Sequence, residues 1–325
     1  MKTPSYWYIE KSWISSVLLP LSYFWLLLSF FRNTFKKKYF FKIPIICVGN
    51  VLAGGAGKTP LVIEICKYYK KKKISIHVVY KVYKNKIDMN VLNVNQSKND
   101  NLDDEAILIS KYANTWLCKK RKYGINAAIK AGANLIILDD GLQDVSIKKD
   151  INILVSNENQ GNGNNKIIPA GPLREPVATA IKKSNCLFFY GEKSNINKYF
   201  KNYKNNIFCG EIKIDKQNII NLNKRKVIAF AGIAHPNNFF KTLNQQGVNI
   251  IDTLSFPDHF KYQRNDINKI LLKCKTQSAI PITTYKDYVK IPDDLKKNFS
   301  VVKIHITFDK SKFFNFINNK INLYV

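Results

Sequence analysis

The feature that most constrains the fold is a glycine-rich loop between an apolar run and a helical pattern. Residues 45–48 (Ile-Ile-Cys-Val) are typical of a buried strand, with Pro44 at its entrance, where the missing N–H of proline costs least. The loop 49–60 follows, and the residues from Leu61 onward have a helical pattern. Strand, glycine loop and helix in this order are typical of a phosphate-binding loop, and they predict an α/β fold built on a parallel sheet.

The loop sequence itself favours nucleotide binding. In Leu52-Ala53-Gly54-Gly55-Ala56-Gly57-Lys58-Thr59, backbone N–H groups can converge on phosphate oxygens at a helix N-terminus. Lys58 can neutralise the β- and γ-phosphates, and the Thr59 hydroxyl can reach Mg²⁺. The usual pattern has a glycine where this chain has Leu52, but three glycines still allow close approach of the backbone. We therefore predict that residues 52–59 bind ATP or GTP; the alternative is a glycine-rich turn without a ligand.

Carboxylates follow the predicted strands and precede a predicted helix. Asp139 and Asp140 end the apolar run 135–138, where a sheet that carries a phosphate loop holds Mg²⁺ or its water shell. Without such a loop, the same residues would make a plain Asp-Gly turn. Residues 103–105 (Asp-Asp-Glu) are expected to cap the apolar helix that follows them. The alternative is that they supply a general base and a metal contact.

The charge of the chain is strongly positive. Its 52 Lys+Arg and 23 Asp+Glu give a net charge of +29, which suggests a polyanionic partner such as nucleic acid, an anionic membrane or a phosphorylated ligand. Only five of the basic residues are arginines, so codon bias explains most of the lysines equally well. Arginine offers a bidentate fork to phosphate or carboxylate, which makes Arg174 and Arg121 candidate binding residues.

The N-terminal part of the chain raises the question of a membrane. Residues 12–31 carry no charge and would extend ~30 Å as a helix, about the thickness of a bilayer core. Pro20 and five serines interrupt the apolar surface, so a span and a shallow in-plane helix both remain open. Five positive charges follow between Arg32 and Lys42, which places the body of the protein on the cytoplasmic side. A buried core helix with a solvated basic end is the alternative.

A second α/β pattern begins after residue 226. Strands are predicted over 227–231 and 248–253, with a helix over 237–246 between them, and the length of 325 residues suits two domains. His259 follows Asp258 and is a candidate ligand or proton partner. The six cysteines have no metal-ligand spacing and are typical of a reducing compartment, so neither zinc nor disulfides are expected.

Together these segments resemble the tetraacyldisaccharide 4'-kinase family, the lipid A kinases of Gram-negative bacteria. The resemblance covers nearly the whole chain, and the string Pro-Ala-Gly-Pro-Leu-Arg-Glu-Pro at 169–176 is its most specific motif. The other segments that carry it are the apolar N-terminal helix, residues 49–60, Asp104-Glu105, Arg121, 139–143, Gly161-Asn162-Gly163, 229–234, 256–259 and Lys286-Asp287.

The resemblance implies an architecture of two α/β/α domains with mainly parallel sheets, joined by a β-ribbon hinge. Residues 1–42 would form a membrane-associating helix and basic segment, 43–212 a P-loop NTPase-like kinase domain, and 213–325 a smaller α/β domain. A return of the last strand and helix to the first domain is compatible with this division.

The resemblance also implies an activity. The γ-phosphate of ATP would be transferred, with Mg²⁺ required, to the 4'-hydroxyl of tetraacyldisaccharide 1-phosphate, a lipid A precursor, to give lipid IVA. The protein would act as a monomer on the cytoplasmic face of the inner membrane, anchored or peripheral through residues 12–31. A lipid substrate explains why such a kinase has a membrane-seeking helix.

Roles for individual residues follow from the resemblance alone. Asp104 and His259 would form the catalytic pair, with Asp104 as the base or as the residue that orients it. Lys58, Arg121 and Arg174 would contact phosphate or substrate, and residues 52–59 would hold the nucleotide. The metal contacts would be Thr59, Glu105 and either Asp139 or Asp140.

The chain departs from the family pattern at several positions around these motifs. Tyr80-Lys81-Val82-Tyr83 stands where the family has Ser-Arg-Gly-Tyr, and Asp144 stands where it has His. Ala56 replaces Thr, Asp103 and Ala106 replace Gly and Pro, and Tyr285 replaces Glu. These changes surround the chemical core and predict a reduced turnover.

One rival function shares the glycine loop. A membrane-surface P-loop ATPase of the partitioning or targeting type would use the positive charge to hold nucleic acid or a protein cargo. Such a protein has no need for the segments 169–176 and 256–259. We therefore expect the lipid kinase, with no nucleic-acid partner.

Overall fold

The chain forms two compact units. The computed structural model describes residues 4–82, 87, 89–97, 102–201, 203–215, 222, 225–233, 236–258 and 260–322. The large unit comprises the described residues of 4–211 and 306–322, and the small unit comprises those of 212–305. The chain therefore passes from one unit to the other within strand β8 and returns within strand β13.

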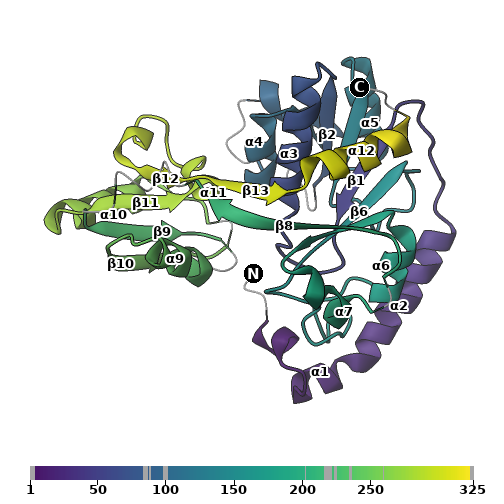
Figure 1. The fold of residues 1–325 in the computed structure, drawn as a ribbon, viewed down its shortest axis with the longest axis horizontal. Helices are drawn as coiled ribbons and strands as arrows, with labels where there is room; N and C mark the ends of the chain where they lie inside the picture. Colours follow the sequence, from purple (N-terminus) through teal and green to yellow (C-terminus); the bar gives the residue numbers. More distant parts are fainter. Residues whose placement is uncertain are drawn as a thin grey trace. The chain divides into compact units, whose positions relative to one another are not determined.

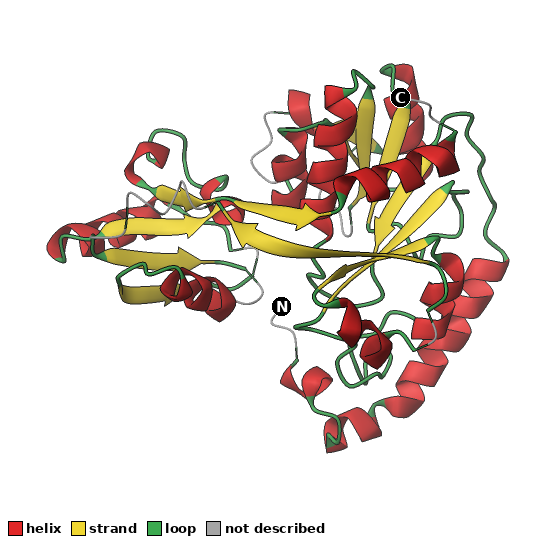
Figure 2. Ribbon diagram, viewed as in Figure 1, coloured by secondary structure: helices red, strands yellow, loops and turns green. Residues whose placement is uncertain are grey.

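The large unit contains most of the regular structure (Figures 1 and 2). Its strands are β1 (Ile45–Gly49), β2 (Ile76–Lys81), β3 (Val91–Asn93), β4 (Asn114–Cys118), β5 (Leu135–Asp139), β6 (Ile151–Asn157), β7 (Cys186–Tyr190), β8 (Asn206–Ile214) and β13 (Ile304–Phe308). Its helices are η1 (Ser5–Tyr8), α1 (Trp13–Val17), α2 (Leu19–Thr34), α3 (Lys58–Lys71), η2 (Val94–Gln96), α4 (Asp104–Ser110), α5 (Arg121–Lys130), α6 (Val177–Lys183), η3 (Lys193–Asn195), α7 (Ile196–Tyr199) and α12 (Lys310–Ile321).

One sheet runs through the large unit. Its strand order is β13-β8-β7-β6-β1-β5-β2-β4-β3, and the pairs from β8 to β4 are parallel, whereas β3 is antiparallel to β4. Val48 of β1 and Tyr80 of β2 are both in register with Asp139 of β5. The carboxyl ends of these three strands therefore meet at one edge, the usual place for ligands in an open α/β sheet.

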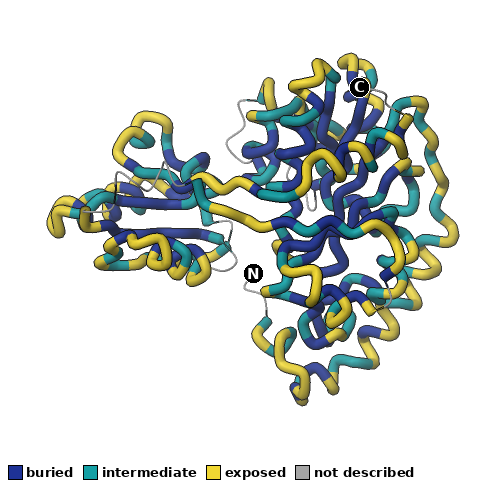
Figure 3. The backbone as a smooth tube through the Cα atoms, viewed as in Figure 1, coloured by how far each residue is buried: buried dark blue, intermediate teal, exposed yellow. Residues whose placement is uncertain are grey.

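The sheet is buried on both faces. Successive side chains of a strand point to opposite faces, so Ile46 and Val48 join the core cluster beneath α3 and α12, whereas Ile45 and Cys47 join the cluster beneath α5 and α6. This double burial explains why β1 is an uninterrupted apolar run and not an alternating one. Figure 3 shows the buried strands between more exposed helices.

The N-terminal apolar segment is divided into two helices. α1 ends at Val17, and α2 begins at Leu19 with Pro20 in its first turn, where a proline is tolerated. None of the helices in the described part of the chain is long and apolar enough to span a membrane. Large apolar side chains of α1 and α2 nevertheless face solvent: Trp13, for example, is 76 % exposed and Phe24 is 59 % exposed.

The small unit has its own parallel sheet of order β10-β9-β11-β12. Its elements are β9 (Val227–Ala231), α9 (Pro236–Gln245), β10 (Ile250–Ser255), α10 (Arg264–Thr276), β11 (Ile280–Thr284), α11 (Tyr285–Tyr288), η4 (Lys296–Asn298) and β12 (Ser300–Val302). Phe240 of α9 and Ile267 of α10 belong to two separate core clusters, with β9 contributing to both. The sheet is thus covered on both faces.

The predicted fold class is confirmed: both units are α/β layers built on mainly parallel sheets. Several boundaries differ from the prediction. The helix after the glycine loop begins at Lys58, three residues before Leu61, because Gly57 adopts the left-handed conformation and caps it. The strand predicted over 248–253 is β10, which begins at Ile250, after a turn that contains Gly247 at φ 78°.

Candidate functional site

The glycine loop joins β1 to α3 at the edge where the strands end. Gly57 has φ 85°, and a Cβ atom there would lie 2.7 Å from the ring of Tyr190. The Tyr190 hydroxyl donates a hydrogen bond of 2.9 Å to the Gly57 carbonyl oxygen. Only glycine meets both demands at this position, because an L side chain would be strained by the backbone and blocked by the ring. Tyr190, the last residue of β7, thereby fixes the point where α3 begins.

The missing glycine of the loop has a structural explanation. Leu52 is buried in the core and forms an antiparallel bridge with Leu173. Ala53 N donates to the Pro172 carbonyl oxygen at 2.7 Å, and Arg174 N donates to the Val51 carbonyl oxygen at 2.8 Å. The start of the loop is therefore paired with the segment that leads to Arg174. Because this backbone is held in an extended pairing, position 52 does not need the conformational freedom of glycine, and the Leu52 side chain packs in the core.

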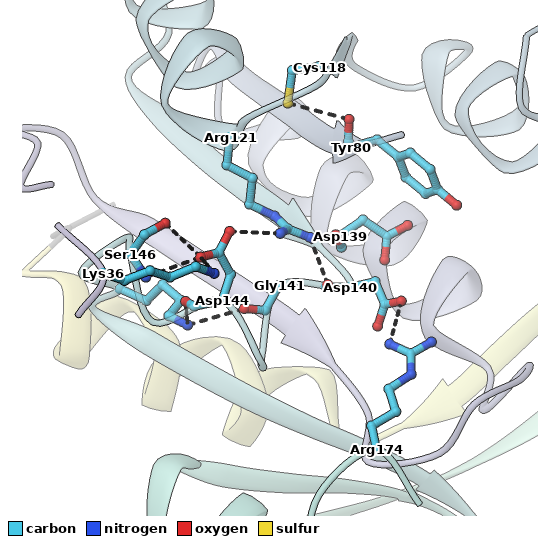
Figure 4. Close-up of polar contacts among 11 residues, drawn as sticks. Lys36, Tyr80, Cys118, Arg121, Asp139, Asp140, Gly141, Asp144, Ser146 and Arg174 are labelled. Carbon is cyan, nitrogen blue, oxygen red and sulfur yellow. Dashed lines mark hydrogen bonds and ion pairs between the residues drawn. The ribbon is translucent and has the colours of Figure 1, made fainter. Parts of the chain in front are cut away.

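This pairing brings Arg174 to Asp140, as Figure 4 shows, and Lys58 completes a charged cluster. Asp140 accepts a 2.7 Å hydrogen bond from Nη1 of Arg174 and lies 3.4 Å from Nζ of Lys58. Lys58 is only 9 % exposed and also donates to the Asn50 side-chain oxygen at 3.2 Å. Burial alone would raise the pKa of Asp140, but the charges of Lys58 and Arg174 outweigh it and hold that pKa well below its usual range.

Asp139 has the opposite environment. It is 1 % exposed, and neither of its carboxylate oxygens has a hydrogen-bond partner among the residues that the structure describes. Burial and the nearby charge of Glu105 raise its pKa to about 8, despite the opposing effect of Lys58. Two adjacent aspartates at the end of β5 thus differ in charge: Asp140 is ionised, and Asp139 is protonated near neutral pH in the absence of a ligand.

The acids at the start of α4 confirm the predicted cap. Asp103 is the N-cap, and its side chain accepts a hydrogen bond from Glu105 N at 3.2 Å. Asp104 is buried in the first turn, and Glu105 is close enough to Asp139 to raise its pKa. The cap predicted from the sequence is therefore supplied by Asp103, with Asp104 and Glu105 in the first turn of the helix.

Arg121 lies at the first residue of α5 and is buried. Its Nη2 donates to the carbonyl oxygens of Asp139 and Asp140, at 3.3 and 2.7 Å, and its Nη1 pairs with Asp144 at 3.0 Å. Asp144 also accepts hydrogen bonds from the backbone and hydroxyl of Ser146. The arginine that was expected to contact phosphate is therefore engaged with the β5 turn and with the carboxylate that replaces the family's histidine (Figure 4).

The other predicted catalytic residue, His259, lies outside the described residues. Its neighbour Asp258 belongs to the small unit, where it pairs with Lys286 Nζ at 3.5 Å. Asp287, which is fully buried, accepts hydrogen bonds from Gly232 N and from the hydroxyl of Thr284. The Lys286-Asp287 motif thus organises the carboxyl ends of β9 and β11 within the small unit.

Several residues of the site could not be assigned from the sequence. Asn50 holds Lys58 and also donates to the Gly54 carbonyl oxygen, and Gln143 donates to the Asn50 carbonyl oxygen and to Glu175. Nothing in the sequence pointed to Tyr190, the last residue of β7, as a contact of the glycine loop. Asn50 and Gln143 lie within the motifs noted above, but only the folded geometry shows what they hold.

Comparisons with known proteins place the chain in a family. The family model described as Tetraacyldisaccharide-1-P 4'-kinase matches residues 14–322. The chain is 31 % identical to the tetraacyldisaccharide 4'-kinase of Rhodospirillum centenum over 95 % of its own length and 94 % of that protein, and 32 % identical to that of Rickettsia bellii over 89 % of each.

The fold also has a counterpart among solved structures. The chain matches the crystal structure of an LpxK from Aquifex aeolicus in complex with ATP, with a TM-score of 0.74 and 24 % sequence identity. That match covers 95 % of this chain and 99 % of the other, and it supports the fold. On the family model and the identities to the relatives, the chain belongs to the tetraacyldisaccharide 4'-kinase family.

Proposed function

We propose that this protein transfers the γ-phosphate of ATP to the 4'-hydroxyl of tetraacyldisaccharide 1-phosphate, the lipid A precursor. The observation that carries the proposal is the cluster of Lys58, Asp140 and Arg174, with the specific 169–176 string supplying Arg174 beside the glycine loop. Family membership favours this activity over that of a partitioning or targeting ATPase.

The cluster fits what phosphoryl transfer requires. The reaction depends on positioning and on neutralising charge, with little covalent chemistry for the protein to perform. Lys58 and Arg174 hold two positive charges on either side of Asp140, and binding of a polyphosphate would draw both toward the phosphate oxygens. With Lys58 and Arg174 turned toward the phosphates, Asp140 would be an ionised carboxylate at the edge of the nucleotide.

The residues present also fit Mg²⁺. Within the described ranges no group of three or more His, Cys, Asp or Glu could hold a metal by itself. Mg²⁺ bound with nucleotide needs only one or two carboxylates, because phosphate oxygens and water complete its shell. Asp139, whose buried carboxylate oxygens have no hydrogen-bond partner among the described residues, is the best candidate. Asp140 is adjacent in the sequence, Glu105 is close enough to raise the pKa of Asp139, and Thr59 follows Lys58 in the first turn of α3. Bound there, the ion would neutralise charge on the transferred phosphoryl group.

Asp104 is the candidate general base toward the 4'-hydroxyl. It is buried in the first turn of α4, next to Glu105. That Asp104 and His259 form a catalytic pair is a prediction from the resemblance. The nucleotide-binding roles of residues 52–59 and of Arg121 are also predictions from the resemblance.

We further propose that the protein works on the cytoplasmic face of the inner membrane as a monomer. The exposed apolar side chains of α1 and α2, followed by the basic residues from Arg32 to Lys42, support attachment to an anionic lipid surface. A kinase for a tetraacylated substrate has to reach a hydroxyl that lies at such a surface.

The direct test is transfer of radiolabel from γ-labelled ATP to tetraacyldisaccharide 1-phosphate in detergent micelles. Wild type should label the lipid, and Lys58→Ala should lower the rate by at least about a hundredfold, because the charge that faces the phosphates is lost. Lys70→Ala, at an exposed position of the same helix, is the matched control and should keep the wild-type rate. ATP consumption that does not depend on the lipid would overturn the proposal.

A further inference from the structure

The N-terminal helices have an apolar outer side and a polar inner side. Ser15 of α1 and Ser22 of α2 are buried, whereas Trp13, Leu21 and Phe24 are each more than half exposed. A surface helix of a water-soluble protein has the reverse arrangement, with apolar residues toward the core. The question is therefore what the buried hydroxyls of Ser15 and Ser22 contact on the inner side.

Both serines contact one loop of the large unit, residues 164–174, which we call the 164–174 loop. The Ser22 hydroxyl donates to the Ile167 carbonyl oxygen at 2.7 Å and accepts from Ala170 N at 3.2 Å. The Ser15 hydroxyl accepts from the side chain of Asn164 at 3.0 Å. Ser22 thus bonds to the backbone of the 164–174 loop and Ser15 to one of its side chains, and both serines are buried.

The segment before α1 adds further bonds to the same loop. Trp7 Nε1 donates to the Pro169 carbonyl oxygen at 3.0 Å, and Asn164 N donates to the Trp7 carbonyl oxygen at 2.8 Å. Asn164 is itself buried, and its amide also reaches the carbonyl oxygens of Tyr6 and Ala170. The 164–174 loop is thus held by residues that lie about 140 to 160 positions earlier in the chain.

The other end of the 164–174 loop holds the phosphate loop. Its last residues pair with the backbone of Val51 and Ala53, and its final residue, Arg174, contacts Asp140. Leu173 N in turn donates to the Lys166 carbonyl oxygen, so the two ends of the loop are joined to each other. Continuous hydrogen bonding therefore runs from α2 through the 164–174 loop to the residues that face the nucleotide.

We propose that Ser22, Trp7 and Asn164 are positioning residues that couple the seating of α1 and α2 on a lipid surface to the nucleotide affinity of the phosphate loop. Lipid acyl chains would cover the exposed apolar side and hold the helices in place, and the serine side would then hold the 164–174 loop. A fixed loop presents the backbone of residues 51–53 and the Arg174 side chain in their binding geometry. The inference rests on the membrane attachment proposed above, but not on the identity of the phosphate acceptor.

The test measures nucleotide affinity with and without lipid. The full chain is titrated with a fluorescent ATP analogue and Mg²⁺, in buffer and with vesicles of phosphatidylethanolamine and phosphatidylglycerol, and vesicle binding is followed by co-sedimentation. Vesicles should tighten the wild-type Kd by about five- to tenfold, a common size for coupling between sites. Ser22→Ala should still bind the vesicles, because its apolar side is intact, but its Kd should change by about twofold or less.

Two further variants keep the test decisive. Ser16→Ala is the matched control, because Ser16 is exposed and its hydroxyl donates to the carbonyl oxygen of Ser12, the N-cap of the same helix; it should respond like wild type. Trp7→Phe removes the donor to Pro169 while keeping an aromatic ring, and it should lose the vesicle response. This variant carries the test if Ser22→Ala does not fold. In the transfer assay, Ser22→Ala should raise KM for ATP and leave kcat within about twofold, a split that general loss of structure would not produce.

The results also separate this inference from the proposed function. Vesicles that leave the wild-type Kd unchanged, or variants that keep the full vesicle response, would overturn the coupling. Because the binding measurement contains no lipid substrate, an intact vesicle response in a protein that phosphorylates no lipid would overturn the proposed function and leave the coupling in place.

Discussion

At the scale of single residues, the site depends on two neighbouring aspartates with different environments. Asp140 has Lys58 and Arg174 beside it, whereas Asp139 points into a buried region without a described hydrogen-bond partner. The sequence predicted that one of the two would contact a metal but could not distinguish them, because the difference comes from residues at positions 58, 105 and 174 that only the fold brings near. The raised pKa of Asp139, together with its buried position, is typical of a functional carboxylate and supports its assignment as the candidate metal ligand.

The pKa of Asp139 makes a prediction about stability. A carboxyl with a folded pKa of about 8 and an unfolded pKa near 3.9 stabilises the ligand-free protein fully at low pH, and this contribution is lost as the pH rises through about 8. Asp139→Asn removes the titration. The difference in the free energy of unfolding, wild type minus variant, should therefore fall between about pH 5 and about pH 8 in urea titrations.

A control and a contrary result define this test. Asp294→Asn, at an exposed position, should give a difference that varies little over the same pH range. A difference that rises with pH would mean that Asp139 is ionised in the folded protein, and the proposed account of its environment would be wrong.

The departures from the family pattern at Lys81 and Val82 act differently in the structure. Val82 is buried beside Leu102, Ala106 and Leu117, and its N–H donates to the Cys118 carbonyl oxygen, so this chain uses the side chain as core. Lys81 lies near Arg121, and burial lowers its pKa. The sequence could show that both positions had changed, but not that one change had been absorbed by packing.

Restoring the two family residues should therefore have unequal effects. Lys81→Arg should raise turnover in the transfer assay with little change in stability, because a guanidinium keeps its charge where an ammonium is penalised by burial. Val82→Gly should cost about 2–3 kcal/mol of unfolding free energy through the cavity and the added backbone freedom. Equal turnover for Lys81→Arg and wild type would contradict the prediction that the departures from the family pattern lower the turnover.

At the scale of elements, α12 completes the core over the phosphate-loop helix. Lys310 Nζ pairs with Glu64 at 2.7 Å, the Tyr69 hydroxyl donates to Asn318 at 2.7 Å, and the rings of Tyr68 and Phe314 are stacked. These partners lie some 250 residues apart in the chain. The stability of α3, and hence the position of Lys58, depends on the last helix of the chain.

This packing predicts a large effect far from the nucleotide. Phe313 of α12 is fully buried and contacts the rings of Phe188 and Phe208, so Phe313→Ala should lower the unfolding free energy by about 3–5 kcal/mol. Asn315→Ala, exposed on the same helix, is the control and should change it by less than about 0.5 kcal/mol. Equal denaturation midpoints for the two variants would show that α12 does not hold the large unit together.

The elements differ in how far the sequence could predict them. Buried parallel strands such as β1 and β5 are apolar on both faces, so their runs are clear and are followed by the site residues. The apolar segment 12–31 was ambiguous, since its composition suits a span, a surface helix or a core helix. The break at Leu18 and the inward serines are tertiary features, and no local pattern predicts them.

At the scale of the whole molecule, the chain crosses between its units twice. Residues 306–322 return to the large unit, which is therefore built from two separate stretches of sequence. The candidate site residues Lys58, Asp140 and Arg174 lie in the large unit. The sequence predicted that Lys58 and Asp140 would lie close together, because each follows a strand that ends at the same edge, whereas Arg174 was a candidate only as one of few arginines and by the resemblance. The catalytic role implied for His259, which lies outside the described residues, rests on the resemblance.

The central claim is that this chain phosphorylates the 4'-oxygen of a tetraacylated disaccharide. The most direct measurement is the mass and ³¹P NMR spectrum of the lipid after incubation of tetraacyldisaccharide 1-phosphate with ATP, Mg²⁺ and wild-type protein. The account predicts a lipid that has gained one phosphoryl group, attached at the 4'-oxygen, and no such product with Lys58→Ala. An unchanged lipid, or a phosphoryl group at any other oxygen, would contradict it.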